Sequence, residues 1–256
     1  MLTMLLGQQA VYTKYPCFLC LWDSRARDIH WTKTDWSLQG ALTSGENVIN
    51  TALIPPEKVL LLLLHIKLGL MKQFIKSLFK DGECFRYQCS KFPKLSEAKM
   101  KEGVFTGPDT RKLLSDSLFS ETKDGDHEKE AWYSFKDVVH RFLENTKDAF
   151  YKIIVHRMLT AYEFQRCMMS LKVHFLYSHI DCFPGNLGAY NKEHGERFHQ
   201  DVRDIVSRYQ GRWDVNMLAD YCWMLRRETE DGNRKCVRRS VNQKRKKFHR
   251  QKGVNV

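Results

Sequence analysis

The stretch "YPCFLCLWDSR", residues 15–25, places two cysteines three positions apart, at Cys17 and Cys20. Two thiolates at this spacing can bind one metal ion from a single turn. Structural zinc sites are usually built from two such closely spaced ligand pairs. The stretch therefore predicts one half of a metal site, and the other half has to be found elsewhere in the chain.

The histidines of "VHFLYSHI" (residues 173–180), His174 and His179, form the best second pair. Their five-residue separation does not suit a regular helix, so we expect His179 to lie where a long helix ends, before Pro184. A zinc ion bound by both pairs would staple the start of the chain to a distant helix. Alternatively, the histidines are ordinary packing residues of an aromatic-rich helix. Rival ligands are present at Cys84, Cys89, Cys182, His30 and His199.

The cysteines also bear on the compartment and on membranes. The chain has eight cysteines, and its first residues, "MLTMLL", lack the basic region of a secretory signal. Reduced thiols in the cytosol or nucleus are therefore expected, where paired cysteines more often bind metal than form disulfides. The longest apolar run, residues 59–71, is interrupted by His65 and Lys67 and is too short to span a bilayer. No membrane partner is expected.

Apolar periodicity predicts a mainly α-helical fold. From Lys58 onward, apolar residues recur at three- and four-residue steps until Asp81-Gly82. Any sheet is expected within roughly the first 60 residues. Further helices are expected within residues 94–107, 109–119, 131–146, 149–180, 191–210 and 214–228.

The net charge of +12 makes a polyanion, most often nucleic acid, a reasonable partner. Basic residues concentrate in residues 226–252, which also contain few large apolar side chains, so a largely disordered tail is expected there. Its run Lys244, Arg245, Lys246 and Lys247 is a candidate for phosphate binding or nuclear import. The alternative is a tail that is merely solvated.

Three quoted stretches, together with the histidine pair, resemble one family. The order of Cys-x-x-Cys, a long helical insertion, His-x4-His and a Glu on a following helix resembles the catalytic region of Transib-type DNA transposases and the V(D)J recombinase nuclease. The chain looks closer still to an invertebrate transposon-derived group, which carries "YTKYPCFLCLWDSRARD" (residues 12–28), "LHIKLGLMK" (64–72) and "GERFHQD" (195–201) almost verbatim. The resemblance covers about residues 2–226 and leaves the tail unmatched.

The resemblance implies an RNase H-like core with a helical insertion that a zinc ion fastens to the core. The implied zinc ligands are Cys17, Cys20, His174 and His179. Glu196 would be the third carboxylate of a two-magnesium site, and His65 would lie near the scissile phosphate. The implied parts are the end of the core (1–57), the insertion (58–181), core helices (182–226) and the basic tail (227–256).

The resemblance also implies what the chain lacks. In relatives the second catalytic Asp lies roughly 20 residues before the first zinc-binding cysteine, a distance that reaches past Met1 here. The chain is therefore expected to be the C-terminal part of a transposase that cuts no DNA alone, although the family's enzymes are magnesium-dependent strand transferases. Expected partners are DNA, bound weakly and without sequence preference, and either a full-length transposase or a second copy of the chain.

Two other interpretations remain open. The chain is part of an active zinc-containing recombinase, or it is a zinc-stabilised helical interaction protein unrelated to DNA. A nuclear location is expected if the basic tail is an import signal.

Overall fold

The computed structural model describes residues 6–8, 13–38, 52, 54–59, 61, 63–122, 125–144, 147–185, 209, 216–217 and 219–223. It divides the chain into two compact units, residues 1–204 and 205–256. In the second unit, Met217 and Tyr221 are buried, and the Tyr209 hydroxyl donates a hydrogen bond to Asp220 at 2.6 Å. The site lies in the first unit.

The first unit is mainly helical, as the sequence predicts. Among the described residues the β pairing is an isolated antiparallel bridge between Cys20 and Leu38. No described helix is long and apolar enough to cross a membrane. The helices are α2 (Leu63–Ser77), α3 (Glu83–Lys91), α4 (Glu97–Lys101), α5 (Gly107–Leu114), α6 (Ser117–Glu121), α7 (Asp126–Arg141), α8 (Tyr151–Phe164) and α9 (Leu171–Ser178), with short 3-10 turns η1 (Arg27–Ile29), η2 (Pro56–Lys58) and η3 (Ile180–Cys182).

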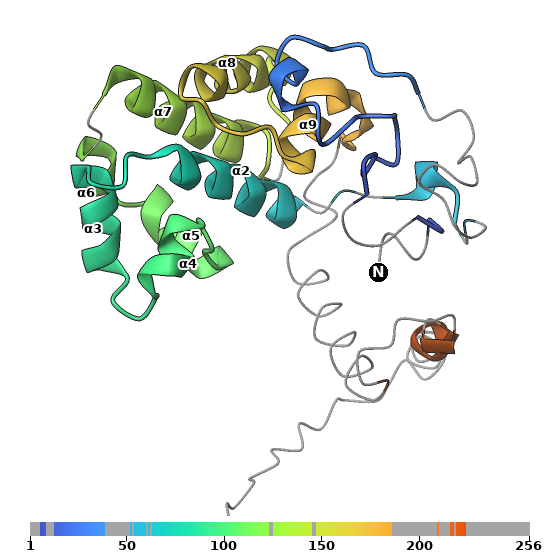
Figure 1. Cartoon of the computed structure of the whole chain (residues 1–256), viewed down its shortest axis with the longest axis horizontal. Coiled ribbons are helices and arrows are strands. Elements are labelled where there is room, and N and C mark those ends of the chain that lie inside the picture. Colours follow the sequence, from blue (N-terminus) through green and yellow to red (C-terminus); the bar gives the residue numbers. More distant parts are fainter. Residues whose placement is uncertain are drawn as a thin grey trace, which may run out of the picture. The chain divides into compact units, whose positions relative to one another are not determined.

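The core is formed where α7, α8 and α2 pack together (Figure 1). Apolar residues recur every three or four positions in each helix, which places them on one face. At the centre, the fully buried Trp132 of α7 contacts Phe74 of α2 and Phe119 of α6, with ring centroids 5.4 and 4.7 Å away. The Tyr162 hydroxyl of α8 donates a hydrogen bond to the Leu70 carbonyl of α2 at 3.2 Å.

Helices α3 to α7 differ from the prediction in several places. Helix α4 covers only Glu97–Lys101 of the expected 94–107, and α7 starts and ends five residues before the expected 131–146. Helix α3 is not among the predicted helices, because it is short and mostly polar. The helix predicted for residues 109–119 is in fact two helices, α5 and α6. They separate because the Asp116 carboxylate accepts a hydrogen bond from the Phe119 amide and so caps a new helix.

The single long helix predicted for residues 149–180 is also wrong. Helix α8 ends at Phe164, and Arg166 then adopts a left-handed conformation with φ of 58°. Helix α9 starts again after Ser170, whose hydroxyl accepts a hydrogen bond from the Val173 amide at 3.5 Å. The break turns α9 into a separate element, and this element carries both histidines.

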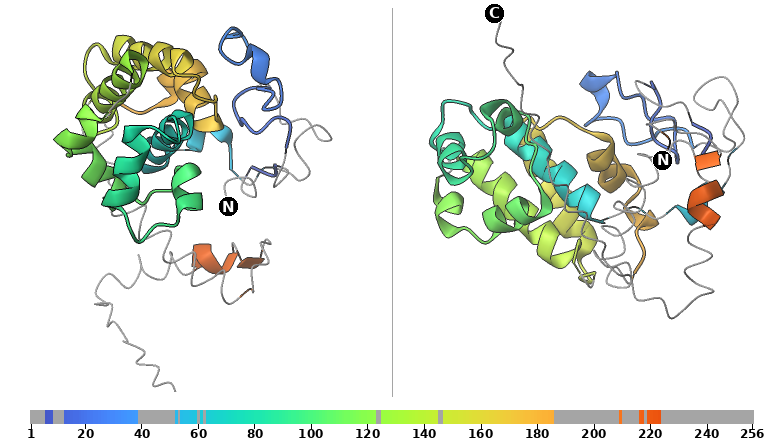
Figure 2. Two further views of the ribbon diagram at one scale, coloured as in Figure 1. Left: turned by 60° about the vertical axis from the view of Figure 1, so that its left-hand side comes forward. Right: turned by 90° about the horizontal axis from the view of Figure 1, so that it is seen from below.

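The N-terminal segment, residues 13–38, lies along α9 (Figures 1 and 2). It has little regular structure beyond η1, and its loop is closed by backbone hydrogen bonds such as Ser24 N–H to the Lys14 carbonyl at 2.9 Å. Four consecutive residues of α9, Val173 to Leu176, are buried. A helix buried on all sides needs cover from several elements; here α2 and α8 contact α9 from the core, and the N-terminal segment adds its own cover.

Candidate metal centre

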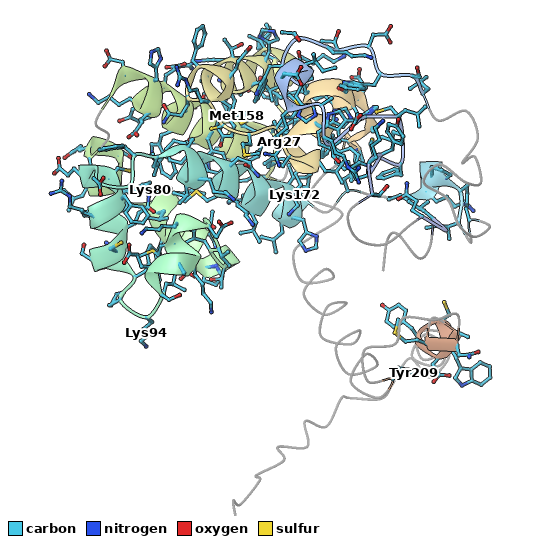
Figure 3. The ribbon with its side chains drawn as sticks, in the orientation of Figure 1. Arg27, Lys80, Lys94, Met158, Lys172 and Tyr209 are labelled. Carbon is cyan, nitrogen blue, oxygen red and sulfur yellow. The ribbon has the colours of Figure 1, made fainter. Side chains whose placement is uncertain are left out.

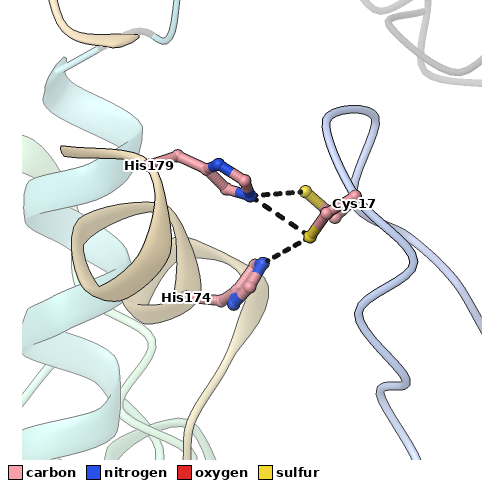
Figure 4. A group of neighbouring side chains, drawn as sticks. Cys17, His174 and His179 are labelled. Atoms are coloured by element: carbon pink, nitrogen blue, oxygen red, sulfur yellow. Dashed lines mark hydrogen bonds between the residues drawn. The ribbon is translucent and has the colours of Figure 1, made fainter. Parts of the chain in front are cut away.

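Four side chains meet between the N-terminal segment and α9. Cys17 and Cys20 come from the segment, and His174 and His179 come from α9 and its C-cap. The four potential ligand atoms all lie within 4.8 Å of one another. Among the described residues, this is the group of His, Cys, Asp and Glu side chains that could hold a metal ion. Figure 4 shows the two histidine rings facing the cysteine sulfurs across the gap.

The distances between these atoms suit a tetrahedral zinc ion. The Nε2 of His174 lies 3.2 Å from the Cys20 Sγ, and the Nε2 of His179 lies 3.2 Å from the same sulfur and 3.6 Å from the Cys17 Sγ. Zn–S and Zn–N bonds of about 2.3 and 2.0 Å at tetrahedral angles put sulfur and nitrogen about 3.6 Å apart. The three sulfur–nitrogen distances are close to this value, so the four side chains are compatible with tetrahedral coordination of one metal ion.

The cysteines already favour a charged sulfur. A hydrogen bond from Cys20 lowers the pKa of Cys17 to about 3, against the opposing effect of burial, and both histidines add to the lowering. The same thiol–thiol hydrogen bond raises the pKa of Cys20. The opposite shifts follow from the hydrogen bond between the two thiols, and loss of a proton from either cysteine gives the thiolate that binds a metal.

Both histidines present Nε2 to the sulfurs. Burial lowers the pKa of His174, which favours the neutral ring that a metal requires. When Nε2 binds a metal, Nδ1 carries the proton. The Ser178 hydroxyl oxygen lies 3.3 Å from the Nδ1 of His174, where it can accept a hydrogen bond from this N–H group. Such an outer hydrogen bond orients a ligand histidine.

Aromatic packing holds the two halves of the cluster together. The indole of Trp22 stacks on the His174 ring at 4.7 Å with 12° between the planes. Phe18 packs on Phe175 at 5.4 Å. The Tyr177 hydroxyl donates a hydrogen bond to the Trp31 carbonyl at 2.8 Å. The N-terminal segment thus contacts α9 through rings on both sides of the ligand pairs.

The rival ligands that the structure describes lie elsewhere or have other partners. The ring of His30 is buried, but its Nε2 is 2.7 Å from the Asp23 carbonyl, and the ring packs against Trp22. Cys84 and Cys89 are on α3, outside the cluster. Cys182 is exposed in η3 and is not one of the four clustered ligands.

The remaining predicted site residues are His65, Glu196, His199 and the basic run 244–247. His65 is half-buried in the first turn of α2 and is not a member of the cluster. Glu196 and His199 lie outside the residues that the structure describes, as does the basic run 244–247. The roles assigned to them by resemblance therefore stay predictions.

Two family models match the chain, each described as a domain of unknown function. DUF8703 matches residues 1–54, which contain the cysteine pair, and DUF8704 matches residues 63–144, which run from α2 into the loop after α7. The histidine pair lies beyond both matches, and neither match covers half of the chain. No curated protein and no solved structure matches it.

Sequence reasoning did not identify the residues that support the cluster. Ser178 lies within hydrogen-bonding distance of the His174 ring, and Trp22 stacks on that ring. A signal for Ser178 is its position beside His179 and four residues after His174, one helical turn away. Trp22 carries no comparable signal, because its contact depends on how the segment docks on α9.

Proposed function

We propose that the cluster is a structural zinc site that fastens the N-terminal segment to α9, in a transposase-derived protein that binds DNA. The observation that carries the zinc site is the meeting of Cys17, Cys20, His174 and His179 within 4.8 Å, from segments more than 150 residues apart. Two soft thiolates with two imidazoles favour Zn²⁺ over hard cations such as Mg²⁺.

A structural role fits the site better than a catalytic one. Catalytic zinc usually keeps one coordination position open for water or substrate, whereas structural zinc takes four protein ligands. Here the protein supplies four ligands, and both cysteines and His174 are buried. Bound zinc would replace the thiol protons and join residues 13–38 to α9, in addition to the aromatic contacts and the Tyr177 hydrogen bond between them.

The DNA-binding part of the proposal rests on charge and on resemblance. The chain carries 42 Lys and Arg against 30 Asp and Glu. Transib-type transposases, which it resembles, act on DNA and join a helical insertion to an RNase H-like core through the same ligand order. By this proposal, the N-terminal segment corresponds to the end of that core, α2 to α9 to the insertion, and the protein acts in the nucleus.

Titration of a short fluorescein-labelled DNA duplex of arbitrary sequence with the zinc-loaded protein tests the DNA part. Fluorescence anisotropy at several salt concentrations gives the observed binding constant. Phosphate contacts release counterions, so the logarithm of this constant should fall linearly with log[salt]. A slope near zero, or no binding at low salt, would contradict DNA binding and favour an interaction protein whose zinc site serves the fold alone.

A further inference from the structure

The two ligand histidines are held by different parts of the chain. His174 lies inside α9, and Trp22 stacks on its ring. His179 is the residue at which α9 ends. Its N–H donates a hydrogen bond to the Phe175 carbonyl at 3.0 Å, whereas its carbonyl accepts one from the Cys182 N–H of η3, also at 3.0 Å. Figure 4 shows His179 on the ribbon that leaves the last turn of α9.

This change of backbone direction is what allows His179 to reach the sulfurs. On a continuous helix, side chains five positions apart point about 140° away from each other, so His174 and His179 would not face one ion. In the structure, the backbone of His179 leaves the helix, with φ of −133° and ψ of 33°. Since η3 begins at the next residue, the contacts that fix η3 also fix the position of His179.

The end of η3 is held against the loop that precedes α8. Phe183, which follows η3, is buried and packs on the Phe142 ring with 5.4 Å between the centroids. Its carbonyl accepts a hydrogen bond from the Lys147 ammonium group. The same ammonium group lies 4.7 Å from the Tyr151 ring centroid and 5.6 Å from that of Phe142. Lys147 thus joins the start of α8 to the chain just beyond His179.

A second set of contacts to η3 is exposed. Asp181 accepts a hydrogen bond from the Tyr151 hydroxyl at 3.2 Å and forms an ion pair with Lys152 at 2.7 Å. The Lys152 and Asp181 side chains are 59% and 70% exposed, so this ion pair should contribute little. The bond from Lys147 is charge-assisted and flanked by aromatic rings, which makes it the stronger of the two connections.

We propose that Lys147 and Phe183, the η3 clamp, are positioning residues for the zinc site. They hold the backbone beyond His179 so that its Nε2 faces the two cysteine sulfurs. The inference rests on the proposed zinc site and deepens it, because it assigns the placement of one ligand to residues outside the site. Loss of the clamp should displace His179 and leave the other three ligands in place.

The first test compares the zinc affinity of lysine variants, measured by competition with a zinc-binding dye. Lys147→Met keeps the aliphatic stem, removes the ammonium group and should weaken zinc binding about tenfold. Lys147→Arg keeps charged N–H donors and should recover most of the affinity. Two variants serve as controls and should keep the wild-type affinity: Lys152→Met, which removes the exposed ion pair with η3, and Lys94→Met, an exposed lysine between α3 and α4 far from Lys172 of α9 (Figure 3).

The second test asks which ligand moves. Nitrogen-15 spectra of the histidine rings separate a metal-bound ring nitrogen from a free one. In zinc-saturated Lys147→Met, the Nε2 signal of His179 should shift toward its free position, whereas that of His174 should stay as in the wild type. Equal shifts of both signals would mean that Lys147 supports the whole unit rather than His179, and would overturn the inference.

Phe183→Leu provides a variant that does not depend on Lys147. It keeps an apolar side chain, loses the ring contact with Phe142 and should also weaken zinc binding severalfold, with the same selective shift of His179. If the wild type binds zinc and both Lys147→Met and Phe183→Leu keep its affinity, the η3 clamp is refuted although the zinc site stands. If the wild type binds no zinc, the proposed zinc site fails and this inference fails with it.

Discussion

The α7–α8 pair and the N-terminal segment hold their structures by different means. The two helices pack through interlocking apolar faces, with Trp132, Phe135 and Tyr162 fully buried. The N-terminal segment is almost without regular structure and meets α9 through a few aromatic rings and the four clustered ligands. Repeated apolar spacing maintains the helices, whereas the segment depends on contacts between residues far apart in the chain.

This difference divides stability between two sources. Hydrophobic burial in α7 and α8 is distributed over many side chains and needs no ligand. In the segment, the ordering of residues 13–38 costs conformational entropy, and the burial of Phe18, Trp22 and Trp36 opposes this cost. A metal bound by both halves of the cluster would add further stabilising free energy. The two regions should therefore respond differently to metal removal, to core mutation and to changes at the helix ends.

Zinc removal should have the largest effect, and it should be confined to one region. After treatment with a chelator, the amides of residues 13–38 and of α9 should exchange hydrogen much faster, because the ligands that join them are lost. Those of α7 and α8 should keep most of their protection. Hydrogen exchange measured by mass spectrometry, with zinc added back as the control, makes the comparison. Equal loss of protection in both regions would contradict it.

A core mutation should have the converse effect. Trp132→Ala leaves a cavity among Phe74, Phe119 and Phe135 and removes the hydrogen bond from the indole to the Ser120 hydroxyl. It should destabilise the helical unit by about 3–5 kcal/mol, with or without zinc. Urea unfolding followed by circular dichroism measures this.

The neighbouring Tyr133 is the matched control, because it is exposed on the same helix. Tyr133→Ala should change the free energy of unfolding by less than about 1 kcal/mol. Similar losses from both substitutions would show that Trp132 is not the centre of the core.

Replacement of Asp116 should show that polar contacts within the helical region contribute to its stability. Its carboxylate caps α6 and accepts hydrogen bonds from Tyr87 at 2.9 Å and Lys91 at 2.8 Å. Burial acts to raise its pKa, but these bonds outweigh burial and lower it. Asp116→Ala should therefore cost about 1–2 kcal/mol at neutral pH.

The pH dependence follows from the direction of that shift. Because the folded-state pKa of Asp116 lies below the unfolded value of about 3.9, the carboxylate stabilises the fold above that pH. Its contribution is lost as the pH falls through the lower folded-state value. Asp116→Asn, which keeps a capping oxygen, should lose less stability than Asp116→Ala at neutral pH and should lack this acid-dependent contribution. Thermal unfolding across the acid range measures both, and equal losses would show that the cap is unimportant.

The smallest effect is expected at the junction between α8 and α9. Arg166 adopts a left-handed conformation that glycine tolerates without steric cost. Arg166→Gly should raise the free energy of unfolding by about 0.5–1 kcal/mol without changing the metal content. Calorimetry of both proteins measures the gain. A loss of stability would mean that a contact of the arginine side chain stabilises the fold by more than the left-handed conformation costs.

The fold could be predicted where apolar periodicity was continuous, as in α2 and α7. The break before α9 could not be predicted in this way, because "QRCMMS" (residues 165–170) contains neither glycine nor proline. Its signal was Ser170, an N-cap residue in front of an apolar run. The split at Asp116 has the same cause: a short polar side chain that can bond the backbone competes with helix continuation.

The ligand pairs could be predicted from the chemistry of zinc, because closely spaced cysteines and histidines suit one ion. The structure brings these four side chains together and places His179 at the end of a helix, although of a short one. Trp22 could not be predicted, since its contact with His174 arises when the segment docks, whereas Ser178 lies one helical turn after His174 on the same helix.

The most direct test of the zinc site is the metal content of the purified protein and of two ligand variants, measured by inductively coupled plasma mass spectrometry. Wild-type protein should contain about one zinc per chain, the stoichiometry of a single four-ligand site. Cys17→Ser and His179→Ala, one from each half of the cluster, should contain almost none, whereas Cys89→Ser on α3 should match the wild type. If both ligand variants keep one zinc per chain, the proposed ligand set is wrong.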